Sequence, residues 1–170
     1  TTAAQLANDD IEGTSGQDTL RLSQGTTYAD SAFVNVSNID ALVLNGANTV
    51  TFNSNADTTG FTSLFGGNGN SVYTQGAAFD NALTFVGGSG NDDLTVTTAA
   101  QLANDDIEGT SGQDTLRLTQ GTTYADSAFA NVSNIDALVL NGANTVTLAS
   151  NADTTGFASV IGGNGNSNYD

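Results

Sequence analysis

The residues best placed to do chemistry are three aspartates, each of which closes a glycine-rich stretch. Asp92 ends GGSGND (87–92), and Asp18 and Asp114 end two copies of GTSGQD (13–18 and 109–114). Glycine permits the positive φ angles of a tight turn, whereas the Leu-Thr-Val shortly after Asp92 favours an extended strand. Each stretch therefore predicts a turn that presents a carboxylate and then starts a strand. In one interpretation the carboxylate only stabilises the turn through Asx hydrogen bonds.

Composition excludes several kinds of chemistry. The formal net charge is −16, and the only basic residues are Arg21 and Arg117, so nucleic acid is excluded as a partner and anionic membrane surfaces are disfavoured. The chain has no His or Cys, which rules out Ser-His and Cys-His nucleophile systems and a disulfide framework. Paired carboxylates can hydrolyse glycosides, but here the acidic residues recur with a repeat, whereas an active site is usually a single break in a periodic pattern. The sequence therefore predicts a protein that is not an enzyme.

A long internal repeat organises the chain. TTAAQLANDDIEGTSGQDTLRL begins at Thr1 and again at Thr97, and residues 97–170 match residues 1–74 at all but nine positions. We take 1–96 as a first unit of four rungs and 97–170 as a second, incomplete unit of three rungs. A rung here means one strand–turn–strand–return-loop coil.

Turn-like segments recur at intervals of roughly 22 to 30 residues, which is typical of stacked repeats. Those of the first unit are GTSGQD (13–18), NGAN (45–48), GGNGNS (66–71) and GGSGND (87–92). On this pattern Asn48 and Ser71 are equivalent to Asp92, and Asp114 follows Asp92 by one 22-residue step. The prediction is an all-β fold: one continuous parallel β-solenoid of about seven rungs, each with two strands, one tight turn and a longer return loop.

Two rows of apolar residues should face the interior of such a stack, because side chains alternate along a strand. The row after the turn holds Leu20, Val50, Tyr73, Leu94, Leu116, Val146 and Tyr169. The row before the turn holds Ile11, Leu44, Leu64, Phe85, Ile107, Leu140 and Val160. Each return loop carries one large anchor, namely Leu6, Phe33, Phe61, Phe79, Leu102, Phe129 and Phe157. A helix bundle is the competing fold, and the regular glycine punctuation argues against it.

Residues 87–95, GGSGNDDLT, fit the nonapeptide G-G-x-G-x-D-x-U-x, in which U is a large apolar residue. The chain therefore resembles RTX proteins, especially the irregular repeats of surface-layer and adhesin proteins. Residues 13–21 and 109–117 fit the motif with Thr at its second position. The resemblance implies a parallel β-roll whose turns bind Ca²⁺ through the aspartate and through turn carbonyls. It departs from the family in having turns on one side only and longer loops on the other.

Carried onto this sequence, the resemblance implies Ca²⁺ as the cofactor. The implied ligands are the carboxylates of Asp92, Asp114 and Asp18 and the turn atoms of Gly87, Ser89, Gly109 and Ser111. Asp92 and Asp114 should lie on adjacent rungs and share one ion, because Ca²⁺ takes 6–8 oxygen ligands. The Ca²⁺ site at Asp18 should be incomplete, because the rung that would complete it would precede Thr1. Turns that offer Asn48, Ser71, Asn144 or Ser167 in place of aspartate should bind weakly or not at all.

Other acidic residues are left with alternative roles. Asn8-Asp9-Asp10 and their copies Asn104-Asp105-Asp106 either cap a return loop or act as peripheral ligands. Glu12 and Glu108 should face water near Arg21 and Arg117.

The leading function is a structural repeat segment of an extracellular surface protein: a fibre, a surface layer or an adhesin stalk. The alternatives are a Ca²⁺-dependent folding or secretion module attached to an enzyme or toxin, and a solenoid that binds carbohydrate or ice. The expected partners are copies of the chain, stacked end to end or side by side, or the continuation of a longer repeat chain, with a glycan as a further possibility. Phe65 and Val86 should point outward and mark a lateral contact, unless a loop covers them. The expected location is outside the cell, with no insertion into a membrane.

Overall fold

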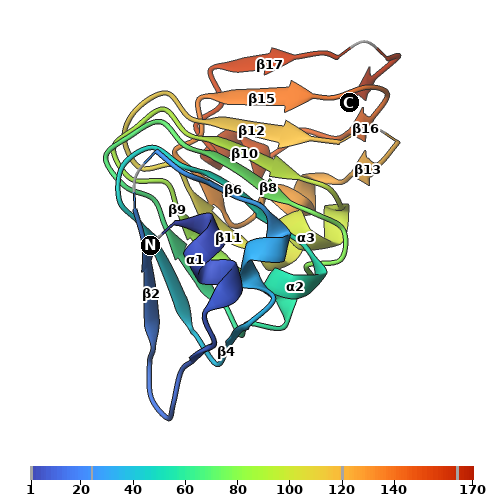
Figure 1. Ribbon diagram of the computed structural model, residues 1–170. Coiled ribbons are helices and arrows are strands. Elements are labelled where there is room, and N and C mark those ends of the chain that lie inside the picture. The colour runs from blue at the N-terminus through green and yellow to red at the C-terminus, as the bar shows by residue number, and fades with distance from the viewer. Residues whose placement is uncertain (1, 24, 120, 164) are drawn as a thin grey trace.

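The computed structural model describes residues 2–23, 25–119, 121–163 and 165–170, and it shows an all-β protein with parallel sheets. Figure 1 shows the strands stacked from the N-terminus at one end to the C-terminus at the other. Of three short α-helices, α1 (Ala3–Asn8) precedes the first strand, and α2 (Ser54–Asp57) and α3 (Ala99–Asn104) lie in connections between strands. No helix among the described residues combines the length and the apolar character needed to cross a membrane.

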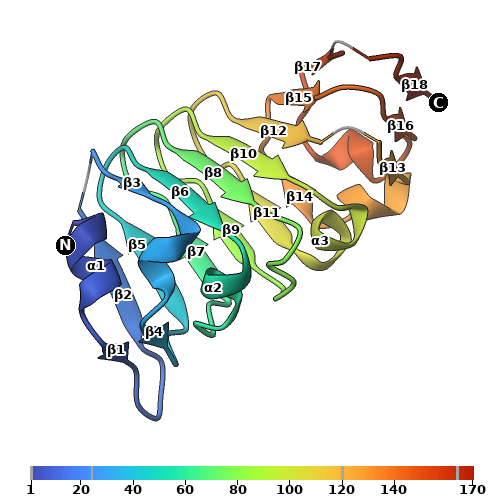
Figure 2. The same cartoon turned by 45° about the vertical axis from the view of Figure 1, so that its right-hand side comes forward.

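Two large sheets contain most of the strands, and Figure 2 shows them running side by side along the molecule. The seven-stranded sheet contains, in spatial order, β3 (Thr27–Tyr28), β6 (Thr49–Phe52), β8 (Val72–Gln75), β10 (Asp93–Val96), β12 (Thr115–Leu118), β15 (Ala137–Leu140) and β17 (Ser159–Ile161). The six-stranded sheet contains β2 (Thr19–Leu22), β5 (Ala41–Leu44), β7 (Ser63–Phe65), β9 (Thr84–Val86), β11 (Asp106–Glu108) and β14 (Val132–Ser133).

Two smaller sheets complete the fold at its two ends. At the N-terminal end β1 (Ile11–Glu12) pairs with β4 (Val36–Ser37). At the C-terminal end β16 (Thr145–Val146) lies between β13 (Thr123–Tyr124) and β18 (Asn168–Tyr169). Short 3-10 helices η1 (Asp30–Phe33), η2 (Asp126–Phe129) and η3 (Ala152–Thr154) lie in three of the connections.

Neighbouring strands of one sheet are about 22 residues apart in the sequence. Four successive pairings in the seven-stranded sheet lead from Thr27 through Thr49, Val72 and Asp93 to Thr115. The copy of Thr27 in the second unit is Thr123, eight residues beyond Thr115. The 96-residue repeat is therefore not a whole number of steps, and identical sequences fall in different sheets. For example, β2 lies in the six-stranded sheet, whereas its copy β12 lies in the seven-stranded sheet.

This mismatch corrects the register expected from the turn pattern. Leu20 is in register with Leu42 rather than with Val50, and Leu116 is in register with Leu138 rather than with Val146. The 30-residue interval that follows each GTSGQD turn contains an additional turn and two additional short strands. Val50 instead pairs with Tyr28. The extra segment places two more short strands between one glycine-rich turn and the next, so the strands that follow lie in a different sheet from the one expected.

The expected interior rows are nonetheless buried along most of the molecule. Of the fourteen row residues, eleven are at most 9 % exposed, Ile11 is partly buried, and Val160 and Tyr169 are 41 % and 45 % exposed. These last two lie on the terminal strands β17 and β18, which have a neighbour on one side only. Six of the seven loop anchors are fully buried, and Phe157 is partly buried against Phe129. Alternation along the strands therefore predicts burial correctly even where the register differs.

The connections are fixed by capping and by aromatic packing. Thr2 and Gln5 form a capping box at the start of α1, and Thr98 and Gln101 form the same box at the start of α3. Phe33 packs edge-on against Phe61 with ring centroids 5.6 Å apart, and Phe52 contacts Phe79 at 5.3 Å. Such contacts hold each connection against the next one and leave the turns free to stack on the opposite edge.

Candidate functional site

Asp92 and Asp114 lie side by side at the starts of two paired strands. Each immediately precedes a strand of the seven-stranded sheet, β10 or β12, and Asp93 is in register with Thr115. The Asp92 N–H donates to Asp114 Oδ1 at 2.8 Å, and Asp92 Oδ1 in turn accepts from the Ser71 N–H at 2.9 Å. Each carboxylate therefore points toward the preceding strand and caps a backbone N–H there.

The same contact recurs along a column that we call the turn ladder. Its members are Thr26, Asn48, Ser71, Asp92, Asp114 and Asp136. In each pair the side-chain oxygen of one member accepts the backbone N–H of the member before it, at 2.8–3.4 Å. Hydroxyl, amide and carboxylate oxygens all fill this position, so the ladder does not depend on aspartate.

Two shorter columns repeat the arrangement. The Asp18 N–H donates to Asp40 Oδ2 at 2.8 Å, and on another edge the Asn144 N–H donates to Ser167 Oγ at 3.3 Å. Asp18 thus has an acidic neighbour, Asp40, on the following strand. Its outer oxygen, Oδ2, accepts from the Thr14 N–H at 2.7 Å within its own turn.

Sequence reasoning missed Asp136 and Asp40. Both follow a recognised aspartate by 22 residues, and both precede the segment ALVL, so a strict 22-residue step from Asp114 and Asp18 would have found them. Their turns, SNID, contain no glycine, so the pattern of glycine-rich turns does not mark them. Asn38 and Asn134 adopt the positive φ of 53° in these turns instead, as asparagine tolerates better than most residues.

Two carboxylates of the turn ladder, Asp92 and Asp114, are buried, which perturbs their ionisation. Asp92 is 3 % exposed and Asp114 is 2 % exposed. Burial raises the pKa of Asp92 to about 6; the hydrogen bond from Ser71 opposes this shift, and the charge of Asp114 adds to it. Burial also raises the pKa of Asp114, against the hydrogen bond from Asp92 and with a further contribution from Asp136. Asp92 Oδ2 is buried without a hydrogen-bond partner among the described residues.

The first glycine of each turn packs directly against these oxygens. A methyl group on Gly87 would lie 2.5 Å from Gly109 O and 3.0 Å from Asp92 Oδ2, and one on Gly109 would lie 2.6 Å from Asp114 Oδ2. A side chain larger than hydrogen would therefore displace either the next turn or the carboxylate. Gly87 and Gly109 let a backbone carbonyl and a carboxylate oxygen converge on one point.

Turns that carry serine at the ladder position place a tyrosine hydroxyl at the corresponding point. A methyl group on Gly66 would lie 2.8 Å from Tyr73 Oη, and one on Gly162 would lie 2.8 Å from Tyr169 Oη. In the sequence, each hydroxyl residue at a ladder position has Tyr two residues later, whereas each Asp has Leu two residues later. Ser71 with Tyr73 thus occupies the space that Asp92 occupies with Leu94. Burial raises the pKa of the Tyr73 hydroxyl, which has no hydrogen bond of good geometry within the described chain.

The other expected ligands lie in the turns and take part in turn-to-turn hydrogen bonds. The Ser89 N–H donates to Gly67 O at 3.2 Å, and the Ser111 N–H donates to Gly88 O at 3.3 Å. Thr110 Oγ1 also donates to Gly88 O. The turns at 66–71, 87–92 and 109–114 are therefore stacked through their own backbone, with the carboxylates on the inner side.

The carboxylate and carbonyl oxygens beside Gly87 are of the kind that bind a hard cation, but there are few of them. Asp92 Oδ2 and Gly109 O converge near Gly87, and both are the kind of ligand that Ca²⁺ prefers. No group of three or more acidic side chains close enough to hold a metal ion occurs in the part of the chain that the structure describes. An ion at Asp92 would therefore take most of its ligands from backbone carbonyls and water.

Two further aspartates, Asp105 and Asp30, cap backbone N–H groups. Asp105 is 2 % exposed and accepts from the Leu83 N–H at 2.9 Å, whereas its copy Asp9 is exposed at the N-terminal end. Burial raises the pKa of Asp105 to about 6. Asp30 accepts three backbone N–H groups around α2, those of Asn53, Asn55 and Ala56, and these bonds lower its pKa against the effect of burial.

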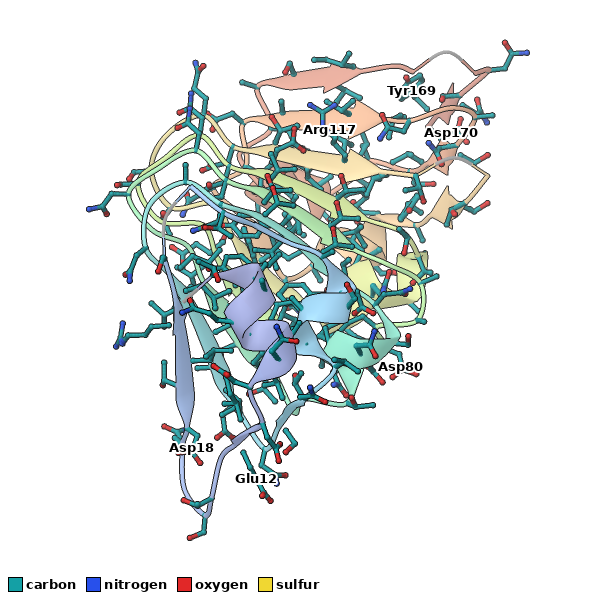
Figure 3. All side chains as sticks on the ribbon, viewed as in Figure 1. Glu12, Asp18, Asp80, Arg117, Tyr169 and Asp170 are labelled. Carbon is teal, nitrogen blue, oxygen red and sulfur yellow. The ribbon has the colours of Figure 1, made fainter. Side chains whose placement is uncertain are left out.

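Glu12 and Glu108 are exposed, as expected, but Arg117 has a different partner. Arg117 Nε lies 2.6 Å from Asp93 Oδ2 and forms an ion pair with Asp93 rather than with Glu108. Glu108 instead accepts from Asn134 Nδ2 at 3.4 Å, and Glu12 accepts from Asn38 Nδ2 at 3.5 Å. Figure 3 shows Arg117 on the upper sheet and Glu12 and Asp18 at the opposite, N-terminal end.

No family model, no curated protein and no solved structure matches this chain. Its function is therefore inferred from its residues and its fold.

Proposed function

We propose that this chain is a structural repeat segment of an extracellular surface protein, such as a fibre, a surface layer or an adhesin stalk. In this proposal the parallel sheets are the sides of one β-solenoid, and each step of about 22 residues is one rung. The segment has no catalytic role. Its task is to extend a stiff rod by a fixed length for each repeat unit.

The observation that carries this proposal is the pairing across the junction of the two units. β10 of the first unit pairs in register with β12 of the second, and β9 pairs with β11. The turn ladder crosses the same junction through the hydrogen bond from Asp92 to Asp114. Units joined this way have no linker between them, which suits a rod better than a string of separate domains.

A test compares this chain with a variant that carries one additional 96-residue unit. Each unit adds roughly four strand spacings of ~4.8 Å, so the longest dimension in small-angle X-ray scattering should grow by about 20 Å. Chemical unfolding should remain one transition and move to higher denaturant, because each unit adds an interface with its neighbour. Two independent transitions and a flexible scattering profile would contradict the proposal.

Ca²⁺ is the second part of the proposal. Asp92 and Asp114 would hold the ion together with carbonyls of the turns that contain Gly87, Ser89, Gly109 and Ser111. The buried and unpartnered Asp92 Oδ2 supports this assignment, since a buried charge with one free oxygen is costly unless something compensates it. Bound Ca²⁺ would offset the repulsion between carboxylates and would stabilise only the folded chain.

Calorimetric melting with Ca²⁺ and with excess chelator tests this part. We expect chelation to lower the melting temperature, and Asp92→Asn to remove the difference between the two conditions. Ser71→Ala is the matched control, because it changes a ladder position that has no carboxylate, and it should leave the response to chelator intact. Superimposable melting curves for the unmodified chain would reduce Asp92 to a capping residue of the ladder.

A further inference from the structure

The outer surface of the six-stranded sheet differs from that of its neighbour. Its outward row, which we call the Phe65 row, consists of Arg21, Val43, Phe65, Val86 and Glu108 on five successive strands. Phe65 is 38 % exposed, and Val43 and Val86 on either side of it are half-buried. Figure 2 shows the strands β2, β5, β7, β9 and β11 that carry this row following one another along the molecule.

Charge is distributed along the Phe65 row in a self-complementary way. Arg21 lies at one end and Glu108 at the other, and both are exposed. On the three strands between them, the second outward row consists of Ala41, Ser63 and Thr84, so the middle of the face carries no charge. In a chain with a net charge of −16, this is a surface on which two copies can meet without bringing carboxylates together.

We infer that two copies of this chain dock face to face through the Phe65 row, related by a two-fold axis that lies parallel to the strands and passes by β7. This symmetry reverses the order of the strands, so Phe65 meets Phe65 of the second copy and Val43 meets Val86. Arg21 then meets Glu108 at both ends. A two-fold axis along the stacking direction would instead place Arg21 on Arg21, which like-charge repulsion disfavours.

The second repeat unit offers a natural comparison for this face. The copy of Arg21, Val43 and Phe65 is Arg117, Val139 and Ile161, and it lies on the seven-stranded sheet. There Arg117 is already paired with Asp93, and the row continues through the polar residues Thr95 and Thr74. The similar residues of the second unit therefore lie in a row that is not self-complementary in this way.

The contact should be weak in a single chain. Five strands at ~4.8 Å spacing extend about 20 Å, which gives less than the ~800 Å² per partner of a typical stable interface. The inference rests on the proposed structural role, in which successive units add further contacts and the combined affinity rises with their number. It concerns only the lateral partner, however, and the length increment per unit tests the rod independently.

Sedimentation equilibrium of the full 170-residue chain, up to about 1 mM, tests the proposal. The unmodified chain should form dimers as its concentration rises, and Phe65→Asp should leave monomers. Ile161→Asp, at the equivalent position of the second unit, is the matched control and should dimerise as the unmodified chain does. Circular dichroism and melting confirm that each variant is folded, and Phe65→Ser provides a milder change should Phe65→Asp not fold.

Charge reversal tests the orientation. Arg21→Glu and Glu108→Arg should each weaken dimerisation by about tenfold, and the double variant should restore it because the pair is re-formed with opposite sign. Monomers at every concentration would overturn the proposal. Dimerisation that is unchanged by Phe65→Asp would overturn it as well. So would a double variant that dimerises as weakly as the single variants.

Discussion

Residues 13–18 and 109–114 have the same sequence, GTSGQD, yet they play different parts in the molecule. Asp114 is buried between two strands and accepts the backbone N–H of Asp92. Asp18 is half-exposed at the N-terminal end of its column, and its Oδ2 accepts from Thr14 in its own turn. The first turn has a neighbour on one side, whereas the second has neighbours on both. Position in the stack, rather than local sequence, therefore sets the role of each carboxylate.

The largest effect should come from the core residues that follow these two turns. Leu116 is fully buried between Leu94 and Leu138, so Leu116→Ala should lower the free energy of unfolding by about 3 kcal/mol. Leu20, its copy, pairs only with Leu42 and is 9 % exposed, so Leu20→Ala should cost about 1–2 kcal/mol. Urea unfolding of both variants measures the difference, and equal losses would show that the terminal strands are packed as tightly as the middle.

Removing the carboxylate of Asp114 should also cost more stability than removing that of Asp18. Asp114→Ala leaves the buried Asp92 N–H without an acceptor and should cost about 2 kcal/mol, whereas Asp18→Ala should cost less than about 1 kcal/mol. Asp114→Asn is the control, because its amide oxygen can still accept, as Asn48 does from Thr26. If Asp114→Asn measured in chelator were as damaging as Asp114→Ala, hydrogen bonding would not be what the carboxylate contributes.

The pH dependence of stability sharpens the comparison. Burial raises the pKa of Asp92 and of Asp105 to about 6, above the ~3.9 of an unfolded aspartate. Between these values the folded chain holds more protons than the unfolded chain, so stability contributed by these groups is present below about pH 4 and is lost as the pH rises through 6.

Without Ca²⁺, the free energy of unfolding should thus fall between pH 4.5 and pH 7, as measured by urea unfolding at each pH. Asp92→Asn should flatten this fall. Asp9→Asn, the copy of Asp105 at the exposed N-terminal end, should not. A rise in stability over the same range would mean that these carboxylates are not buried in solution.

The smallest effect concerns the two arginines. Arg117 is ion-paired with Asp93, and its side chain is 36 % exposed, so Arg117→Ala should cost about 0.5 kcal/mol at low salt. Arg21→Ala, at the copied position on the terminal strand β2, should change the stability of the dilute monomer by less. Repeating the measurement in 1 M NaCl should remove most of the Arg117 effect, and a loss that persists there would point to packing of the side-chain stem instead.

Local sequence determined the strands that flank the glycine-rich turns and most of the side chains that are buried. Alternation in segments such as ALVL and DLTV fixes which residues face inward. The glycines of GGSGND predict a tight turn because glycine readily adopts positive φ, as Gly88 does at 106°. The sequence also predicted that Asp92 and Asp114 are neighbours, because they are 22 residues apart and no extra segment lies between them.

Only the tertiary structure decided which strands are neighbours after each GTSGQD turn. Two identical copies of one sequence cannot specify two different sheets, yet β2 and β12 lie in different ones. The choice depends on the 22-residue spacing between paired strands, and the additional turn at SNID, which contains no glycine, interrupts the spacing of the glycine-rich turns. Alternation is a property of neighbours in the chain, whereas register is set by long-range pairing that must bury a complete row at once. Asp40 and Asp136 follow Asp18 and Asp114 by one 22-residue step, and the pairing of the strands shows that each accepts the backbone N–H of that aspartate.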